Sequence, residues 1–138
     1  MSLLKQNETF SEKQSPFIVC DGLVKIFKTD EIEVMALQGL DMEINQGELM
    51  SVIGKSGSGK STLMNIIGGL EKPSAGKIIV DGKNLSDMTE KEMVEYRKKK
   101  IGFVWQKSER NLFPYLTAFE NIEAAMNFSG MKKKEKRY

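Results

Sequence analysis

The hydrophobic positions of the chain fall into short runs separated by glycine, proline and charged residues. The alternation within Val34–Ile44 is imperfect, and a bulge near Gly39 would explain the break. The first two runs are separated by a break at Asp21-Gly22, and turns are predicted at Lys28–Glu31 and at Asp81-Gly82. The runs typical of strands are Phe17–Cys20, Leu23–Phe27, Val34–Ile44, Leu49–Ile53, Lys77–Val80 and Ile101–Trp105.

Helical spacing and capping signals predict helices between and after these runs. The first begins after the glycine-rich segment Gly54–Thr62 and ends at Gly68-Gly69. Its apolar residues recur at the spacing of one helix face, and they are Leu63, Ile66, Ile67 and Leu70.

Two capping boxes predict the other helices. Thr89 and Glu92 have the required spacing, and they open a helix that extends to about Lys100. Thr117 and Glu120 repeat the signal and predict a helix through about Asn127.

Length and composition favour one ordinary soluble domain. The chain has 138 residues, of which 40% are hydrophobic and 29% charged. Residues 1–16 are polar and are expected to form a disordered arm, which leaves 17–138 as the domain. The basic run 132–138 is interpreted as the exposed start of a helix, with contact to anionic lipid or nucleic acid as the alternative.

Charge and residue usage exclude several classes of function. A net charge of +2 provides no strong electrostatic case for nucleic-acid binding. The single cysteine, Cys20, is compatible with a reducing cytosol, and the lack of histidine makes a transition-metal site unfavourable. No apolar run approaches the ~18 residues that span a bilayer, so a membrane connection is expected through a partner.

The segment Gly54–Thr62 fits the phosphate-binding loop pattern G-x-x-x-x-G-K-[ST]. It lies between a predicted strand and a predicted helix, which is the context that this motif requires. A flexible Gly/Ser linker is the alternative, but linkers lack such flanking elements. The candidate nucleotide-binding residues are therefore Gly54, Lys55, Ser56, Gly57, Ser58, Gly59, Lys60, Ser61 and Thr62.

The residue types in this segment suit a polyphosphate. Glycines allow positive φ angles and a close approach of main-chain N–H groups to phosphate oxygens. The helix that follows contributes unpaired N–H groups and the positive end of its dipole. Lys60 would contact the β- and γ-phosphates, and the Ser61 hydroxyl would bind Mg²⁺. The predicted cofactors are ATP and Mg²⁺.

Over roughly residues 17–130, the chain resembles the N-terminal half of an ABC-transporter ATPase of the lipoprotein-release and macrolide-export group. The phosphate loop alone would indicate only a P-loop NTPase, and the other segments narrow the resemblance. The matching segments are Val34–Leu40, Gly47-Glu48, Gly54–Thr62, Leu63–Leu70, Pro73–Gly76, Ile101–Gln106 and Asn111–Asn121.

The resemblance implies a fold and two further site residues. The fold would be an incomplete α/β P-loop core with an antiparallel β subdomain over 17–106, and the start of a helical subdomain over 107–138. Gln106 matches the glutamine that contacts Mg²⁺ and the attacking water, while a polar strand end is the alternative. Phe27 matches the aromatic residue that stacks on adenine, although the family usually has tyrosine there, and a core phenylalanine is the alternative.

The resemblance also implies partners and a location. Asn111–Glu120 would dock against membrane-spanning permease subunits, and a second ATP-binding subunit would complete a dimer. The protein would then lie at the cytoplasmic face of the membrane, held there by its permease partner.

Other family features do not occur in this sequence. The L-S-G-G-Q signature, the Walker B aspartate with its catalytic glutamate, and the switch histidine are absent. We therefore expect nucleotide binding without hydrolysis by this chain alone. The strand at Leu49–Ile53 is expected to lack its parallel neighbours, which follow later in the family's sequence.

Two alternatives to a transporter motor stay open. One is a truncated product that folds poorly or associates through its exposed strands. The other is a small P-loop kinase, which would not account for Gln106 and the block after it.

Overall fold

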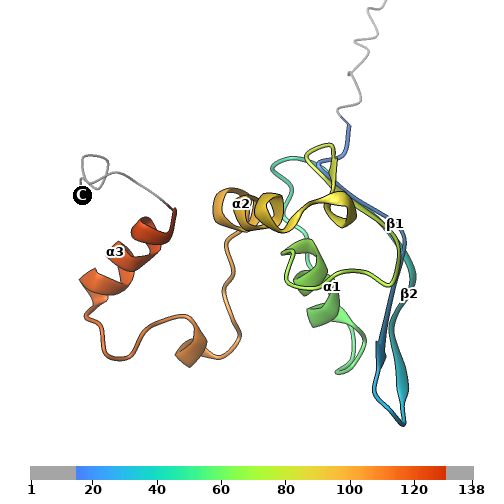
Figure 1. Ribbon diagram of the computed structural model, residues 1–138, viewed down its shortest axis with the longest axis horizontal. Coiled ribbons are helices and arrows are strands. Elements are labelled where there is room, and N and C mark those ends of the chain that lie inside the picture. The colour runs from blue at the N-terminus through green and yellow to red at the C-terminus, as the bar shows by residue number, and fades with distance from the viewer. Residues whose placement is uncertain (1–14, 130–138) are drawn as a thin grey trace, which may run out of the picture.

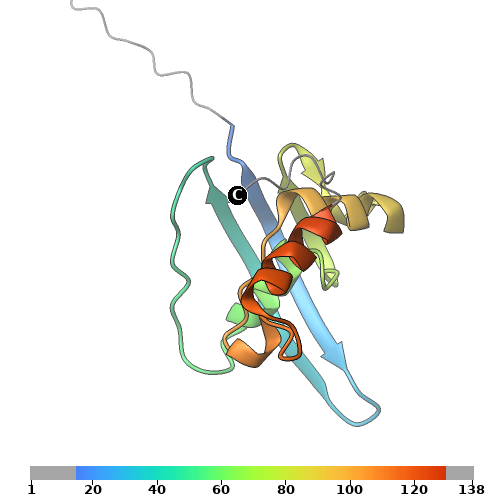
Figure 2. The same cartoon turned by 90° about the vertical axis from the view of Figure 1, so that its left-hand side faces the viewer.

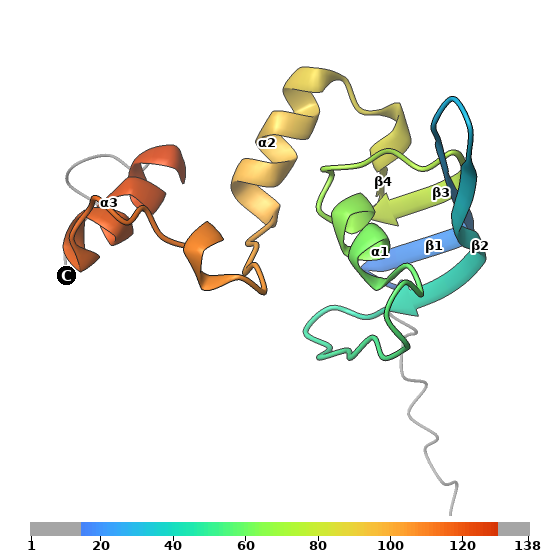
Figure 3. The same cartoon turned by 90° about the horizontal axis from the view of Figure 1, so that it is seen from below.

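Residues 15–129 are described by the computed structural model, and they form a four-stranded antiparallel sheet with a helix on one face (Figures 1 and 3). The sheet order is β2-β1-β3-β4. The strands are β1 (Ile18–Lys28), β2 (Glu33–Ile44), β3 (Ala75–Val80) and β4 (Lys83–Asn84). The helices are α1 (Lys60–Ile67), α2 (Glu90–Lys100) and α3 (Ala118–Ser129), with short 3₁₀ turns at Leu85–Asp87 and Ser108–Arg110.

β1 and β2 form a long hairpin whose strands are interrupted by bulges. The two predicted runs Phe17–Cys20 and Leu23–Phe27 belong to one strand, and the break between them is a bulge. Its extra residue is accommodated by a hydrogen bond of 2.6 Å from the Gly22 N–H to Asp41 Oδ1. The bulge predicted near Gly39 is confirmed, since the register shifts there and Gly39 has a φ of 80°. Figure 2 shows the hairpin extending past the rest of the molecule.

The core lies between the sheet and α1. Leu23 of β1, Ile66 of α1 and Ile78 of β3 are fully buried. An isolated helix as short as α1 is unstable in water, so its position depends on this packing. The buried core residues are Cys20, Leu23, Leu37, Leu63, Ile66, Ile78, Val80, Leu85, Met93 and Tyr96.

α2 is attached to the C-terminal end of α1. The Tyr96 hydroxyl donates a hydrogen bond of 2.6 Å to the carbonyl of Ile67, and Arg97 Nη1 donates one of 2.8 Å to the carbonyl of Gly69. These side chains satisfy carbonyl groups that a helix end leaves unpaired. Burial raises the pKa of Tyr96 to about 12, so its hydroxyl stays protonated as a donor.

Both predicted capping boxes are confirmed. The Glu92 carboxylate accepts hydrogen bonds from the N–H and the hydroxyl of Thr89, and these bonds lower the pKa of Glu92. Glu120 and Thr117 make the same contacts before α3, and they lower the pKa of Glu120 in the same way. α3 extends to Ser129, two residues beyond the predicted end. The predicted basic run at 132–138 and most of the 1–16 arm lie outside the described residues.

Two predicted strands are wrong. Leu49–Ile53 and Ile101–Trp105 have no regular secondary structure in the described part of the chain. A strand exists only when a neighbour accepts its main-chain hydrogen bonds, and neither segment pairs with a strand of the sheet. Leu49, Ile53 and Val104 are consequently 97%, 92% and 89% exposed, whereas Val52 and Ile101 are half-buried against the core.

The junction at Gly69 is sensitive to added volume. Gly69 has a φ of 67°, and a methyl group on it would collide with Met93 Sδ. We expect Gly69→Ala to cost about 2–5 kcal/mol, from a left-handed backbone strain of about 1–2 kcal/mol and overpacking of about 1–3 kcal/mol. Urea denaturation measures the loss.

Gly82→Ala is the matched control, because Gly82 has a φ of 73° and open space around it. That variant should show the backbone cost alone. Equal losses in free energy of unfolding for the two variants would contradict the proposed packing of α2 on α1.

Candidate functional site

The phosphate loop Gly54–Gly59 leads directly into α1, as the sequence predicts. Gly57 and Gly59 adopt left-handed conformations with φ angles of 80° and 84°. Gly59 is the N-cap of α1, and no side chain within residues 15–129 caps the helix there. The first N–H groups of α1 therefore face the loop, where an anion would find the positive end of the helix dipole.

The side chain of Lys60 reaches across the loop, and its ammonium group is hydrogen-bonded to loop residues. It donates hydrogen bonds to the carbonyl of Lys55 at 2.7 Å and to the carbonyl of Gly54 at 2.9 Å, with a longer contact of 3.3 Å to Ser58 Oγ. These contacts place one positive charge at the centre of the loop. A phosphate bound there would interact with that charge at short range.

Two glycines of the loop have close neighbours at their Cβ positions. A methyl group on Gly59 would collide with the carbonyl oxygen of Ala36 in β2, and it would lie 3.0 Å from Leu37 Cδ2. A methyl group on Gly54 would lie 2.6 Å from Ser58 Oγ. At Gly59 the loop therefore lies against β2 in a contact that only glycine permits, whereas the neighbour of Gly54 is the exposed side chain of Ser58 in the same loop.

The outer side of the loop is open. Gly57 has no neighbour within 4 Å of its Cβ position, and Lys55, Ser56 and Ser58 are exposed. A hollow of about 390 Å³ lies between Gly57, Ser58 and residues 35–40 of β2. A polyphosphate can approach the main chain of the loop from this side.

Ser61 and Thr62 lie in the first turn of α1, where Ser61 is exposed and Thr62 is half-buried. Mg²⁺ prefers oxygen ligands, which a serine hydroxyl and phosphate groups supply. The described residues hold no cluster of three or more histidine, cysteine, aspartate or glutamate side chains that could bind a metal ion. The exposed hydroxyl of Ser61 suits one ligand position of a Mg²⁺ ion that a bound nucleotide would also hold.

Phe27 lies near the outer end of β1 and is 39% exposed. By the alternation of the strand it shares a face with Lys25, and Lys25 pairs with Leu37 of β2. Leu37 borders Gly59, so this face of the hairpin is the one that contacts the phosphate loop. The ring of Phe27 is not a core side chain, and it is available for stacking.

Gln106 is exposed and follows a segment that contacts the C-terminal end of α1. Phe103 of that segment fills the space beside Gly68, and its ring stacks on Trp105 with centroids 5.0 Å apart. Within the described chain, no hydrogen bond joins Gln106 to the phosphate loop. The structure thus brings together the loop, Ser61 and the hairpin face with Phe27, and it leaves Gln106 separate.

Two residues that hold segments carrying predicted site residues were not singled out in the sequence. Asn111 exchanges hydrogen bonds of 2.7 and 2.8 Å with the main chain of Trp105, which fixes the segment before Gln106. Lys25 has a side chain that is only 14% exposed. A lysine between Leu23 and Phe27 on the apolar face of a strand is the signal that could have revealed it.

A larger groove of about 730 Å³ lies away from the loop, between the β3–β4 hairpin and α2. Its lining contains four lysines and four carboxylates, including the ion pair of 2.8 Å between Lys100 and Asp81. Because the charges balance, this groove favours neither an anion nor a cation. The phosphate loop is the better candidate site.

Comparison with known proteins agrees with this geometry. The sequence pattern of the family described as ABC transporter matches residues 37–138. The chain is 42% identical over 118 residues to the lipoprotein-releasing system ATP-binding protein LolD of Bacteroides thetaiotaomicron, covering 86% of this chain and 51% of that protein. It is 37% identical over 123 residues to the macrolide export ATP-binding/permease protein MacB of Brucella abortus, covering 89% and 19%.

A solved structure has the same fold. The dimeric structure of MJ0796, described as a bacterial ABC transporter cassette, superposes with a TM-score of 0.75 at 40% identity. The match covers 86% of this chain and 51% of that chain. This chain spans about half the length of LolD and of MJ0796.

No helix in the described residues has the length and apolar character that a bilayer crossing requires.

The family match covers more than half of the chain, and the relatives include the lipoprotein-release and macrolide-export proteins that the sequence resembles. The chain therefore belongs to the ABC transporter family, and its relatives are ATP-binding proteins of that family.

Proposed function

We propose that residues 17–138 form the nucleotide-binding part of a transporter ATPase and bind MgATP through Gly54–Thr62. The observation that supports this most is the Lys60 ammonium, centred in a loop with two left-handed glycines at the uncapped start of α1. Such a site offers main-chain donors, a helix dipole and a cation to the same anion.

Each residue has a distinct proposed role. Main-chain N–H groups from Gly57 to Thr62 would donate to the phosphates, and Lys60 would exchange its loop carbonyls for phosphate oxygens. The Ser61 hydroxyl would hold Mg²⁺, which neutralises phosphate charge when it is bound. Phe27 would stack on the base. Gln106 would approach the metal after a movement of the segment that Asn111 now holds.

Partners and location follow from the relatives. LolD and MacB are named as components of a lipoprotein-releasing system and a macrolide exporter. We propose that this chain likewise acts with membrane-spanning permease subunits and a second ATP-binding subunit, at the cytoplasmic face of the membrane. Residues 107–138, which include α3, would begin the helical subdomain that contacts the permease. Phe119, Ile122 and Phe128 of α3 are exposed and suit such a contact.

A second candidate function has its own supporting observation. Leu49, Ile53 and Val104 are almost fully exposed in segments without strand partners. Such segments favour association through main-chain hydrogen bonds. A product that self-associates would show a thermal transition that depends on protein concentration, whereas the nucleotide-binding proposal predicts a transition that MgATP raises.

Lys60→Ala should abolish binding of MgATP. The substitution removes charge-assisted hydrogen bonds worth about 1.5–3 kcal/mol each, so we expect an affinity loss of roughly a hundredfold or more. Isothermal titration calorimetry measures it, and circular dichroism checks that the fold is kept.

Lys98→Ala is the control, because Lys98 is an exposed lysine of α2 far from the loop in sequence. This variant should bind as the unmodified chain does. Unchanged ATP affinity in Lys60→Ala would contradict the proposed site.

Ser61→Ala should remove most of the benefit of Mg²⁺. Alanine suits the first turn of α1, so the helix should persist while one metal ligand is lost. We expect weaker ATP binding in Mg²⁺ and unchanged binding in EDTA, with Ser61→Thr retaining the response. An equal dependence on Mg²⁺ in Ser61→Ala would assign the metal to other ligands.

A further inference from the structure

Lys25 is a charged side chain held on the apolar face of the sheet. It lies in β1, two residues from buried Leu23 and two from Phe27, and it pairs with buried Leu37 of β2. Its side chain is 14% exposed, which is unusual for a lysine. A cation kept in such a place needs compensating contacts.

The compensating contacts come from the segment that follows α1. Lys25 Nζ donates a hydrogen bond of 2.8 Å to the carbonyl of Lys72 and forms an ion pair of 3.0 Å with Glu71 Oε2. The same ammonium lies 4.9 Å from the centroid of the Phe27 ring, over its face. This distance is within the range of a cation–π interaction.

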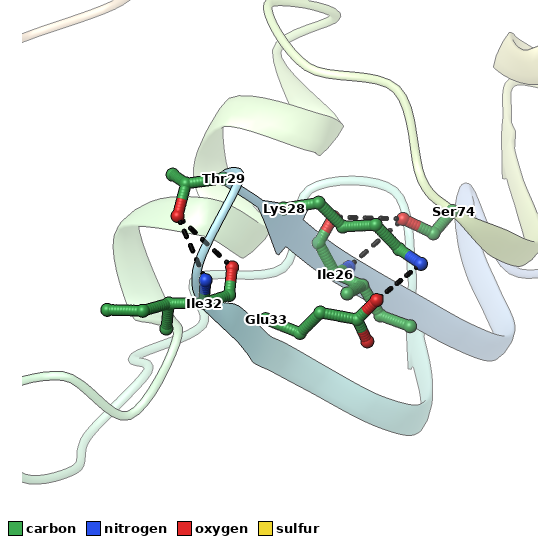
Figure 4. Close-up of polar contacts among 6 residues, drawn as sticks. All are labelled: Ile26, Lys28, Thr29, Ile32, Glu33 and Ser74. Atoms are coloured by element: carbon green, nitrogen blue, oxygen red, sulfur yellow. Dashed lines mark hydrogen bonds and ion pairs between the residues drawn. The ribbon is translucent and has the colours of Figure 1, made fainter.

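The segment that holds Lys25 is itself fastened to β1. The Ser74 N–H donates a hydrogen bond of 2.8 Å to the carbonyl of Val24. Ser74 Oγ accepts one of 3.0 Å from the N–H of Ile26, and Figure 4 shows this side chain reaching the end of the strand. The segment that contains Glu71 and Lys72, the partners of Lys25, is therefore hydrogen-bonded to β1 directly before Phe27.

We propose that Lys25 is a positioning residue for the base of the nucleotide, an inference that rests on the proposed function. Its ammonium covers one face of the Phe27 ring and fixes the orientation of that ring, so the other face is presented to a purine. The cation also attracts the π electrons of the ring. This reduces the repulsion between π-faces when a second aromatic ring stacks on the opposite side. Lys25 would thereby set affinity for the base without contacting the phosphates.

Two ligands separate this role from a merely structural one. MgATP uses both the loop and Phe27, whereas magnesium tripolyphosphate uses the loop alone. Lys25→Met keeps the length of the side chain and removes its charge. We expect this variant to bind MgATP roughly three- to tenfold more weakly, as the loss of a cation–π contact implies, with unchanged binding of tripolyphosphate.

Matched variants complete the test. Lys28→Met removes the same charge from the same strand, where Lys28 pairs with Glu33 at 2.6 Å near the hairpin turn (Figure 4), and it should bind both ligands normally. Lys25→Arg should restore most of the MgATP affinity, because arginine also interacts with aromatic faces. Combining Lys25→Met with Phe27→Ala should weaken MgATP binding no more than Phe27→Ala does.

The outcomes that overturn the inference differ from those that overturn the proposed function. Normal MgATP affinity in Lys25→Met, or an equal loss for MgATP and tripolyphosphate, would refute a role at the base while the phosphate site stands. Additive losses in the double variant would also refute it. If the unmodified chain bound neither ligand while its thermal transition showed it to be folded, both proposals would fail together.

Discussion

The contact between Gly59 and the main chain of Ala36 determines where the phosphate loop meets the sheet. No side chain fits between them, because a methyl group on Gly59 would collide with the carbonyl oxygen of Ala36. The loop is therefore held against β2, and α1 begins at that contact. The start of α1 and the Lys60 side chain are placed against the hairpin by this close approach.

α1 connects the other parts of the molecule. At its start it presents the loop, and at its end the carbonyls of Ile67 and Gly69 accept hydrogen bonds from Tyr96 and Arg97 of α2. The segment after α1 returns to β1 through Ser74 and contacts Lys25. A ligand on the loop would thus contact the start of a helix that packs on β2 at its N-cap and is hydrogen-bonded to α2 at its end. This arrangement lets a short helix hold a rigid site.

Features determined by neighbouring residues were predicted well from the sequence. The turn at Asp81-Gly82 and both capping boxes depend on contacts within a few residues, and each is confirmed. The bulge at Gly39 is a register shift against β1 and is also confirmed, and it could be predicted because it leaves a break in the alternation of β2 itself. The strands at Leu49–Ile53 and Ile101–Trp105 are wrong because an apolar run becomes a strand only beside another strand. Lys25 was missed for a related reason. Its partners Glu71 and Lys72 are more than forty residues away in sequence, so only the folded chain brings them together.

The central claim is that the main-chain N–H groups around Gly57 to Thr62 form a polyphosphate site. The most direct measurement is a ¹⁵N-resolved NMR titration of this chain with Mg²⁺ and a nonhydrolysable ATP analogue. The account predicts that the largest amide shift changes fall within Gly57–Thr62. It would be contradicted if saturating analogue left those amides unchanged, or if the changes fell only along the groove between the β3–β4 hairpin and α2.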